Sequence, residues 1–190
     1  IHAAKELNEL LSGGKVNKII QPAADEVFIL FYTGKNVNIA VSANAQTARI
    51  CPTDRQVKAP AVAPNFCMLL RKHLSGATVK SVENVGFERI TVITFEGKND
   101  FFEPTEKKLV CEIMGKYSNV ILTENGKILG TLKPSFGDID SGRMLLTGLD
   151  YKYPPAQDKI EITDLTRVKE AFSDFPEVDG GYYTQAEIKG

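Results

Sequence analysis

Nine short runs that alternate apolar and polar residues, separated by turn signals, constrain the fold of this chain more than any other feature. Four runs lie between residues 16 and 52: VNKIIQP, DEVFILFYT, NVNIAVS and QTARICP. Five more lie between residues 78 and 133: TVKSVENV, ERITVITFEG, KKLVCEIMG, NVILTE and KILGTLK. Such runs, rich in Val, Ile, Phe and Tyr, are typical of strands, and Asn125-Gly126 is a strong hairpin signal. The spacing predicts two sets of antiparallel strands.

One amphipathic helix is predicted before each set of strands. Residues 3–11 place their Ala and Leu side chains on one helical face, and residues 65–74 do the same with Phe and Leu. Glycines at positions 13, 14 and 76 follow these stretches, as is typical of helix ends. Two strand sets with flanking helices pack most simply as a sandwich or a flattened barrel. We therefore expect an α+β fold with two antiparallel sheets.

A domain boundary is expected near Gln157. The Pro154-Pro155 pair stiffens the chain before it, and Asp164 after it can cap a short helix. Residues 1–157 are therefore predicted to form one domain, and residues 158–190 the beginning of a second, helical domain. Because the first residue is Ile1 rather than Met, we expect the chain to be cut from a longer protein.

Composition mainly excludes classes of protein. Cys51, Cys67 and Cys111 lie far apart, form no CxxC pair and accompany only two histidines. We therefore expect no metal site, no disulfide framework and a cytoplasmic location. No apolar run reaches roughly 18 residues, so no membrane span is expected. Neither a Ser/His/Asp arrangement nor paired catalytic carboxylates can be assembled, so we expect no enzyme activity and no cofactor.

The charge distribution is only slightly informative. The formal net charge is −1; from Asp150 onward nine acidic and five basic residues give −4, which leaves +3 for residues 1–149. This basic bias is compatible with contacts to phosphate groups.

Residues 115–119, read as GKYSN, interrupt two strand-like runs. Lys116 offers a cation, and Ser118 and Asn119 offer donors that suit phosphate or ribose. The alternative is a bulge or hairpin turn whose polar residues bond to their own backbone. The GxxxxGK[ST] pattern of a Walker phosphate-binding loop is absent.

Three further charged residues are candidates for binding. Glu88 and Arg89 are predicted at the start of a strand, where neighbouring side chains point to opposite faces, so each is either solvated or directed at a ligand. Arg143 lies in a glycine-containing loop. Its guanidinium either reaches a phosphate bidentately or ties the loop to Asp138 or Asp140.

Five segments, in order from residue 2 to about Pro155, resemble the N-terminal domain of the NFACT family. This family includes proteins labelled fibronectin-binding protein A. The segments are HAAKELNELLSGGKVNKIIQP, PNFCMLLRKHLSGATV, VGFERI, EIMGKYSNVIL and SGRMLLTGLDYKYPP.

The resemblance implies a role in ribosome-associated quality control. Family members bind the large ribosomal subunit carrying an obstructed peptidyl-tRNA and recruit aminoacyl-tRNA, so that the stalled chain receives an untemplated tail, of alanine in bacteria. The resemblance also implies a fold similar to the N-terminal domain of formamidopyrimidine DNA glycosylases. An Asp-Arg pair that the family needs for tRNA recruitment corresponds to Glu88 and Arg89, with Glu in place of Asp.

The same resemblance gives the candidate residues a role in tRNA binding. Arg89 and Lys116 are expected to neutralise phosphates, as is Arg143, while Glu88 accepts a hydrogen bond from a base or ribose. Ser118 and Asn119 are expected to donate to phosphate or to a 2′-hydroxyl.

Three alternatives remain at this point. A fibronectin-binding surface adhesin is suggested by the older family label. A DNA glycosylase is disfavoured, because those enzymes use an N-terminal Pro beside a Glu and this chain begins Ile-His. A scaffold that binds RNA only weakly by itself is the third.

Overall fold

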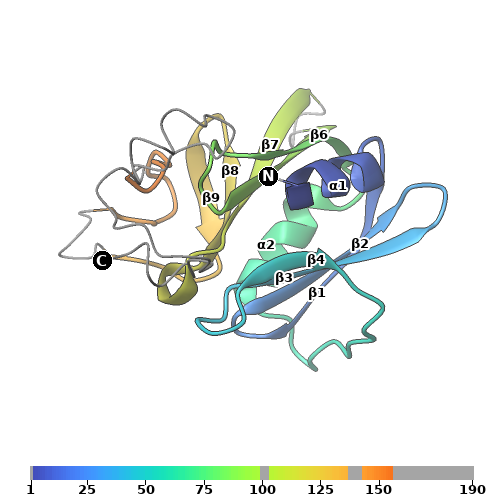
Figure 1. Cartoon of the computed structure of the whole chain (residues 1–190), viewed down its shortest axis with the longest axis horizontal. Coiled ribbons are helices and arrows are strands. Elements are labelled where there is room, and N and C mark those ends of the chain that lie inside the picture. The colour runs from blue at the N-terminus through green and yellow to red at the C-terminus, as the bar shows by residue number, and fades with distance from the viewer. Residues whose placement is uncertain (1, 99–102, 137–142, 156–190) are drawn as a thin grey trace, which may run out of the picture. The chain divides into compact units, whose positions relative to one another are not determined.

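The computed structural model of the protein describes residues 2–98, 103–136 and 143–155 (Figure 1). All of these residues belong to one compact unit that ends at Ala156. The predicted second domain, with the helix expected after Asp164, lies outside the described residues. Within the described ranges, no helix has the length and apolar character that crossing a membrane requires.

Both predicted helices are confirmed. Helix α1 spans His2–Leu11 and helix α2 spans Asn65–Leu74. In each helix the side chains that the 3.6-residue period places on one face are buried, such as Leu7 and Leu11 in α1 and Leu70 in α2. The buried face of each helix packs against the strands, and this packing supplies most of the stability of so short a helix.

All nine predicted strands are present, with ends that shift by a few residues. They are β1 (Lys15–Ala23), β2 (Glu26–Tyr32), β3 (Asn36–Ser42), β4 (Arg49–Pro52), β5 (Thr78–Asn84), β6 (Ile90–Lys98), β7 (Pro104–Glu112), β8 (Asn119–Glu124) and β9 (Lys127–Thr131).

The strands form one sheet rather than two. Its order is β4-β3-β2-β1-β5-β6-β7-β8-β9, and all pairs are antiparallel. The two predicted strand sets join where Lys15 of β1 pairs with Thr78 of β5. The α+β class is confirmed, but the prediction of two separate sheets is wrong. The flattened barrel is also wrong, because β4 and β9 are the two ends of the order and the sheet does not close.

We call β1–β4 the first half of the sheet and β5–β9 the second half. Gly14 lies where the chain passes from α1 into the junction between these halves. A Cβ atom at this position would lie 2.5 Å from Thr33 Cγ2 and 2.9 Å from the Leu11 oxygen, so only glycine fits there. Its carbonyl accepts a hydrogen bond from Val79 N at 2.8 Å, which ties β1 to β5. The junction links residues far apart in sequence, and alternation within a single strand cannot reveal such a pairing.

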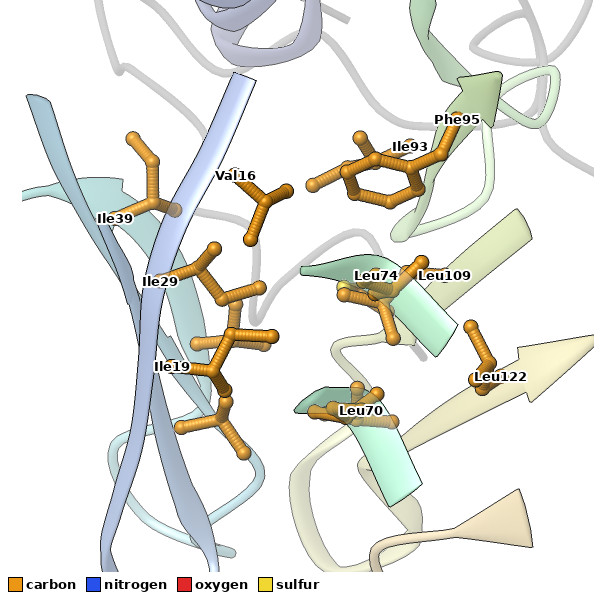
Figure 2. Close-up of a cluster of buried hydrophobic side chains, with 14 of the residues drawn as sticks. Val16, Ile19, Ile29, Ile39, Leu70, Leu74, Ile93, Phe95, Leu109 and Leu122 are labelled. Carbon is orange, nitrogen blue, oxygen red and sulfur yellow. The ribbon is translucent and has the colours of Figure 1, made fainter. Parts of the chain in front are cut away.

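The inner faces of the two halves share one core, with α2 between them (Figure 1). Figure 2 shows Ile19 and Ile29 of the first half facing Leu70 of α2, with Leu122 of the second half beyond. The rings of Phe31 in β2 and Phe95 in β6 stack with centroids 6.4 Å apart, which brings the halves into direct contact. The facing layers of the predicted sandwich therefore exist, although backbone hydrogen bonds connect them at β1 and β5.

Candidate nucleic-acid interface

The register of the second half brings two connecting loops to one end of the sheet. Ile90 of β6 pairs with Glu112 of β7, and Glu112 pairs with Asn119 of β8. The turn between β5 and β6 and the loop between β7 and β8 therefore lie side by side, and Ile113 N donates to Arg89 O at 2.8 Å between them. We call residues 85–89 and 113–118 together the loop end.

The turn between β5 and β6 is held by its own backbone and by one amide side chain. Asn84 Nδ2 donates to the carbonyl oxygens of Gly86 at 2.9 Å and Glu88 at 2.8 Å. This arrangement leaves Arg89 exposed, Glu88 partly buried and the Phe87 ring 43% exposed. The sequence placed Glu88 and Arg89 on a strand, which is wrong because β6 begins at Ile90, so the rule of opposite faces does not apply to them.

The loop between β7 and β8 contains a single 3-10 turn, Gly115–Tyr117. Ser118 is buried, and its hydroxyl oxygen accepts a hydrogen bond from Met114 N at 2.8 Å. Gly115 has φ +56, in the left-handed region that favours glycine. Lys116 is exposed, with its Nζ 4.7 Å from the centroid of the Tyr117 ring, which is itself 49% exposed.

Asn119 connects the start of β8 to the segment after β9. It is buried, and its Oδ1 accepts hydrogen bonds from Val120 N at 2.8 Å and Lys133 N at 3.0 Å, while Nδ2 donates to Lys133 O at 2.6 Å. Ser118 and Asn119 thus bond to the chain's own backbone, as in the alternative that the sequence left open. The side chains that this loop presents to solvent are those of Lys116 and Tyr117.

Arg143 forms an ion pair with a buried carboxylate. Its Nη1 donates to Glu112 Oε2 at 3.1 Å, its Nη2 donates to Glu112 Oε1, and its Nε donates to Lys152 O at 2.6 Å. The guanidinium carbon lies 5.3 Å from the centroid of the Tyr151 ring. Asp138 and Asp140, which the sequence offered as partners, lie outside the described residues.

Glu112 is the centre of this network. Its residue is 0% exposed, and the Tyr151 hydroxyl donates to its Oε1 at 2.7 Å. Burial, followed by the neighbouring negative charge of Glu112, raises the pKa of Tyr151 well above its ordinary value. A buried carboxylate persists only when it is paired and hydrogen-bonded, and Arg143 and Tyr151 supply both requirements here.

The network fastens the segment 143–155 to the sheet. Along this segment Ile128 N donates to Leu149 O at 2.8 Å, and Tyr151 N donates to Gly126 O at 2.8 Å. Leu145 packs on the outer face of the second half of the sheet, in a small apolar cluster. Because Glu112 ends β7 directly before the β7–β8 loop, the ion pair with Arg143 anchors the segment beside the loop end.

All six candidate residues therefore lie at or directly beside the loop end, but their environments differ. Arg89 and Lys116 are exposed, whereas Ser118 and Asn119 are buried and the Arg143 side chain is 13% exposed.

Sequence reasoning missed four residues of this region: Phe87, Glu112, Tyr117 and Tyr151. A charged residue at the end of the apolar run LVCE is the one sequence signal that indicates the buried Glu112. The two exposed aromatic residues carry no local signal, because the same residue types also fill cores.

The chain matches the model of a known protein family. Residues 1–181 match the family model described as NFACT N-terminal and middle domains. The chain belongs to the NFACT family. The resemblance seen in the sequence is confirmed.

Relatives of this NFACT chain include the Rqc2 homolog RqcH of Bacillus subtilis, which is 40% identical over 158 residues. That match covers 82% of this chain and 28% of the relative. The Rqc2 homolog RqcH of Streptococcus pneumoniae strain R6 is 33% identical over 162 residues, covering 84% of this chain and 29% of the relative. The chain therefore spans less than a third of the length of these curated relatives.

Solved structures that share the fold include two from streptococci. The N-terminal domain of the fibronectin-binding protein PavA from Streptococcus pneumoniae matches with a TM-score of 0.81 and 32% identity, covering 89% of this chain and 66% of that chain. The N-terminal part of the fibronectin/fibrinogen-binding protein from Streptococcus suis matches with a TM-score of 0.82 and 28% identity, covering 91% and 67%.

Proposed function

We propose that this chain is the tRNA- and ribosome-binding domain of a cytoplasmic, non-enzymatic factor of ribosome-associated quality control. It would recruit aminoacyl-tRNA, alanyl-tRNA in a bacterium, to large subunits that carry an obstructed peptidyl-tRNA. Membership of the NFACT family and the relatives named RqcH support this role. The observation that carries it is that two loops bring the exposed Arg89 and Lys116 to one end of the sheet.

The exposed residues of the loop end and the partly buried Glu88 are assigned the RNA contacts. Arg89 and Lys116 would neutralise phosphates, and Glu88 would accept from a base or a ribose. Phe87 and Tyr117 flank these charges with exposed rings, on which unpaired bases can stack. Basic and aromatic side chains on one surface are the combination that RNA recognition uses.

Ser118, Asn119 and Arg143 are assigned a positioning role. Ser118 and Asn119 use their polar atoms to hold the β7–β8 loop, and Arg143 compensates the charge of Glu112. In this assignment they affect tRNA affinity indirectly, because they hold the backbone of the loop end in its conformation. If folded Arg143→Ala lost as much tRNA affinity as Arg89→Ala, the guanidinium would instead belong to the RNA contacts.

The test is tRNA binding measured by fluorescence anisotropy over a range of salt concentrations. Arg89→Ala and Lys116→Ala should each weaken binding several-fold at low salt and reduce the slope of log K against log salt by about 0.7–0.9. Lys58→Ala, at an exposed position outside the loop end, is the matched control and should bind like the parent. Parental affinity and slope in both test variants would exclude this site.

A second candidate, a fibronectin-binding surface adhesin, is favoured by one observation. Both structural neighbours carry names that refer to fibronectin. Saturable binding of the chain to immobilised fibronectin, without any binding of tRNA, would support this function. Binding of tRNA that depends on Arg89 and Lys116 would support the first.

A further inference from the structure

A β-bulge in β1 places two lysines on the same outer face of the first half of the sheet. Lys15 pairs with Tyr32 and Lys18 pairs with Leu30, with Asn17 as the extra residue between them. Without the bulge Lys18 would oppose Ile29, which points into the core and is 0% exposed. Because directly opposite residues share a face, Lys15 and Lys18 both point outward beside Tyr32 and Leu30.

The neighbouring strand adds amide side chains to this face. Tyr32 pairs with Asn36 and Leu30 pairs with Asn38, so each lysine begins a row that ends in an asparagine on β3. Two residues along β2 separate the rows, which is about 7 Å at roughly 3.4 Å per residue. The Tyr32 side chain is 55% exposed, and Lys35 lies in the adjoining turn. We define the outer β1–β3 face as Lys15, Lys18, Tyr32, Lys35, Asn36 and Asn38.

The positive charge of this face is not neutralised within the described part of the chain. No ion pair among the described residues includes Lys15, Lys18 or Lys35. The acidic residues of the β2–β3 hairpin are at its other end, where Glu26 pairs with arginines and Asp25 accepts from Asn44. On the β5 side the row through Lys15 continues across Thr78 to Glu96, two strands away, and Glu96 Oε1 lies 3.7 Å from Lys80 Nζ. The carboxylates nearest to the lysines of this face thus pair with other cations, which limits their opposition to an anionic partner.

We propose that the outer β1–β3 face is a second RNA-binding surface, separate from the loop end. The lysines would neutralise consecutive phosphates of one strand, and Tyr32 would stack on a base or ribose. Asn36 and Asn38 would bond to 2′-hydroxyl groups, which distinguish RNA from DNA. An anionic lipid surface also attracts lysines, but attraction by charge does not require two amide side chains in register beside an exposed ring.

The two surfaces lie beside opposite ends of β5. Lys15 pairs with Thr78 at the start of β5, whereas the loop end follows the last residue of β5. β5 has seven residues, so its ends lie about 20 Å apart at roughly 3.3 Å per residue. The outer β1–β3 face would thus hold a stretch of RNA backbone that the loop end does not reach. Binding there does not depend on tRNA binding at the loop end.

The test uses the whole chain and a labelled single-stranded RNA of mixed sequence, with about 20 nucleotides, longer than the roughly 4–16 that one small binding domain covers. Lys15→Glu combined with Lys18→Glu should lower the affinity at least about tenfold at low salt and reduce the salt slope by about 1.4, from two contacts of about 0.7 each. Lys5→Glu combined with Lys58→Glu makes the same change of charge at exposed positions elsewhere. An effect of the Lys15 and Lys18 pair no larger than that of this control would overturn the proposal.

Two further arms test the chemistry of the face. Tyr32→Ala should weaken RNA binding about fivefold or more. Asn36→Ala with Asn38→Ala should reduce the preference for RNA over DNA of the same sequence, and an unchanged preference would contradict the 2′-hydroxyl contacts. If the Lys15 and Lys18 variant lost binding to phosphatidylserine vesicles while keeping RNA binding, the face would be a membrane contact and the proposal wrong.

The same titrations separate this surface from the loop end. In a background of Arg89→Ala and Lys116→Ala, the Lys15 and Lys18 changes should lower RNA affinity by the same factor as in the parent, because distant sites act independently. If the loop-end variants bind tRNA normally and the Lys15 and Lys18 variant does not bind RNA, the tRNA site is wrong and the second surface holds. If instead the loop-end variants lose tRNA binding and the Lys15 and Lys18 variant binds RNA like the parent, the second surface is wrong and the tRNA site holds.

Discussion

Arg143→Ala should destabilise the protein strongly, because it leaves the carboxylate of Glu112 buried without its countercharge. Glu112 is 0% exposed, and Arg143 supplies two of the three side-chain hydrogen bonds that its oxygens accept from the described residues. Removing one partner of a buried pair costs about 3–5 kcal/mol. Since a folded domain is stable by about 5–15 kcal/mol, the loss is a large share of the total.

Urea unfolding at neutral pH, followed by circular dichroism, measures this loss. With a slope of about 2 kcal/mol per molar, a cost of about 4 kcal/mol lowers the midpoint by about 2 M. Lys127→Ala is the matched control. Lys127 Nζ lies 2.7 Å from Oδ1 of Asp150, which belongs to the same segment as Arg143, but this ion pair is at the surface. That exposed pair should contribute no more than about 1 kcal/mol.

Two further variants examine the physical cause. Tyr151→Phe keeps the ring beneath the guanidinium and removes only the hydrogen bond to Glu112, so it should cost about 1.5–3 kcal/mol. Glu112→Gln combined with Arg143→Met removes both charges and should be more stable than Arg143→Ala alone. The reasoning is refuted if Arg143→Ala shifts the midpoint no more than Lys127→Ala, or if the double variant is less stable than Arg143→Ala.

Three other substitutions are expected to act on stability through different causes. Asn119→Ala removes a side chain that makes three hydrogen bonds to the backbone, so its free energy of unfolding should fall by about 1–3 kcal/mol; parental stability in urea would contradict this. The Thr105 hydroxyl, which donates to Glu124 Oε1 at 2.6 Å, is the main cause that lowers the pKa of Glu124. A lowered pKa stabilises the fold above the unfolded value of about 4.5 and stops doing so as pH falls through the folded value, so the cost of Thr105→Val should be full near neutral pH and should shrink as pH falls below about 4.5. A cost that does not change with pH would rule out the carboxylate as the cause. Gly14→Ala, whose Cβ would lie 2.5 Å from Thr33 Cγ2, should lower stability by about 1–3 kcal/mol in thermal melting, and an unchanged midpoint would show that the neighbours give way.

The sequence predicts the local elements well, because their signals are local. The apolar period predicts α2 with both of its ends, and alternation predicts β3 as Asn36–Ser42. The pairing of β1 with β5 carries no such signal, since it joins Lys15 to Thr78 through a glycine that packs against a distant turn. The division into two sheets was wrong for this reason: a gap in the strand pattern does not show whether hydrogen bonds continue across it.

The candidate residues were placed in the correct region, but burial sorts them in a way that residue type does not. Ser118 and Asn119 have polar side chains suited to phosphate, yet both are buried against backbone groups. The partner of Arg143 lies 31 residues away on β7 and was not considered. A sequence of polar residues between strands therefore identifies a loop, while register and burial decide which of its side chains face a ligand.

This sorting separates variants of the loop end into two experimental classes. Substitutions of exposed side chains, such as Arg89 and Lys116, remove at most surface contacts such as that of Lys116 with the Tyr117 ring, so they should change RNA affinity while urea midpoints stay near the parent. Substitutions of the buried supports, such as Glu112 and Asn119, remove hydrogen bonds in the core of the network and should lower the urea midpoint first. Because bound RNA stabilises the folded state, saturating RNA should raise the urea midpoint of a support variant toward that of the parent. An exposed variant should gain less stability from the same RNA concentration, since the loss of a contact raises its Kd.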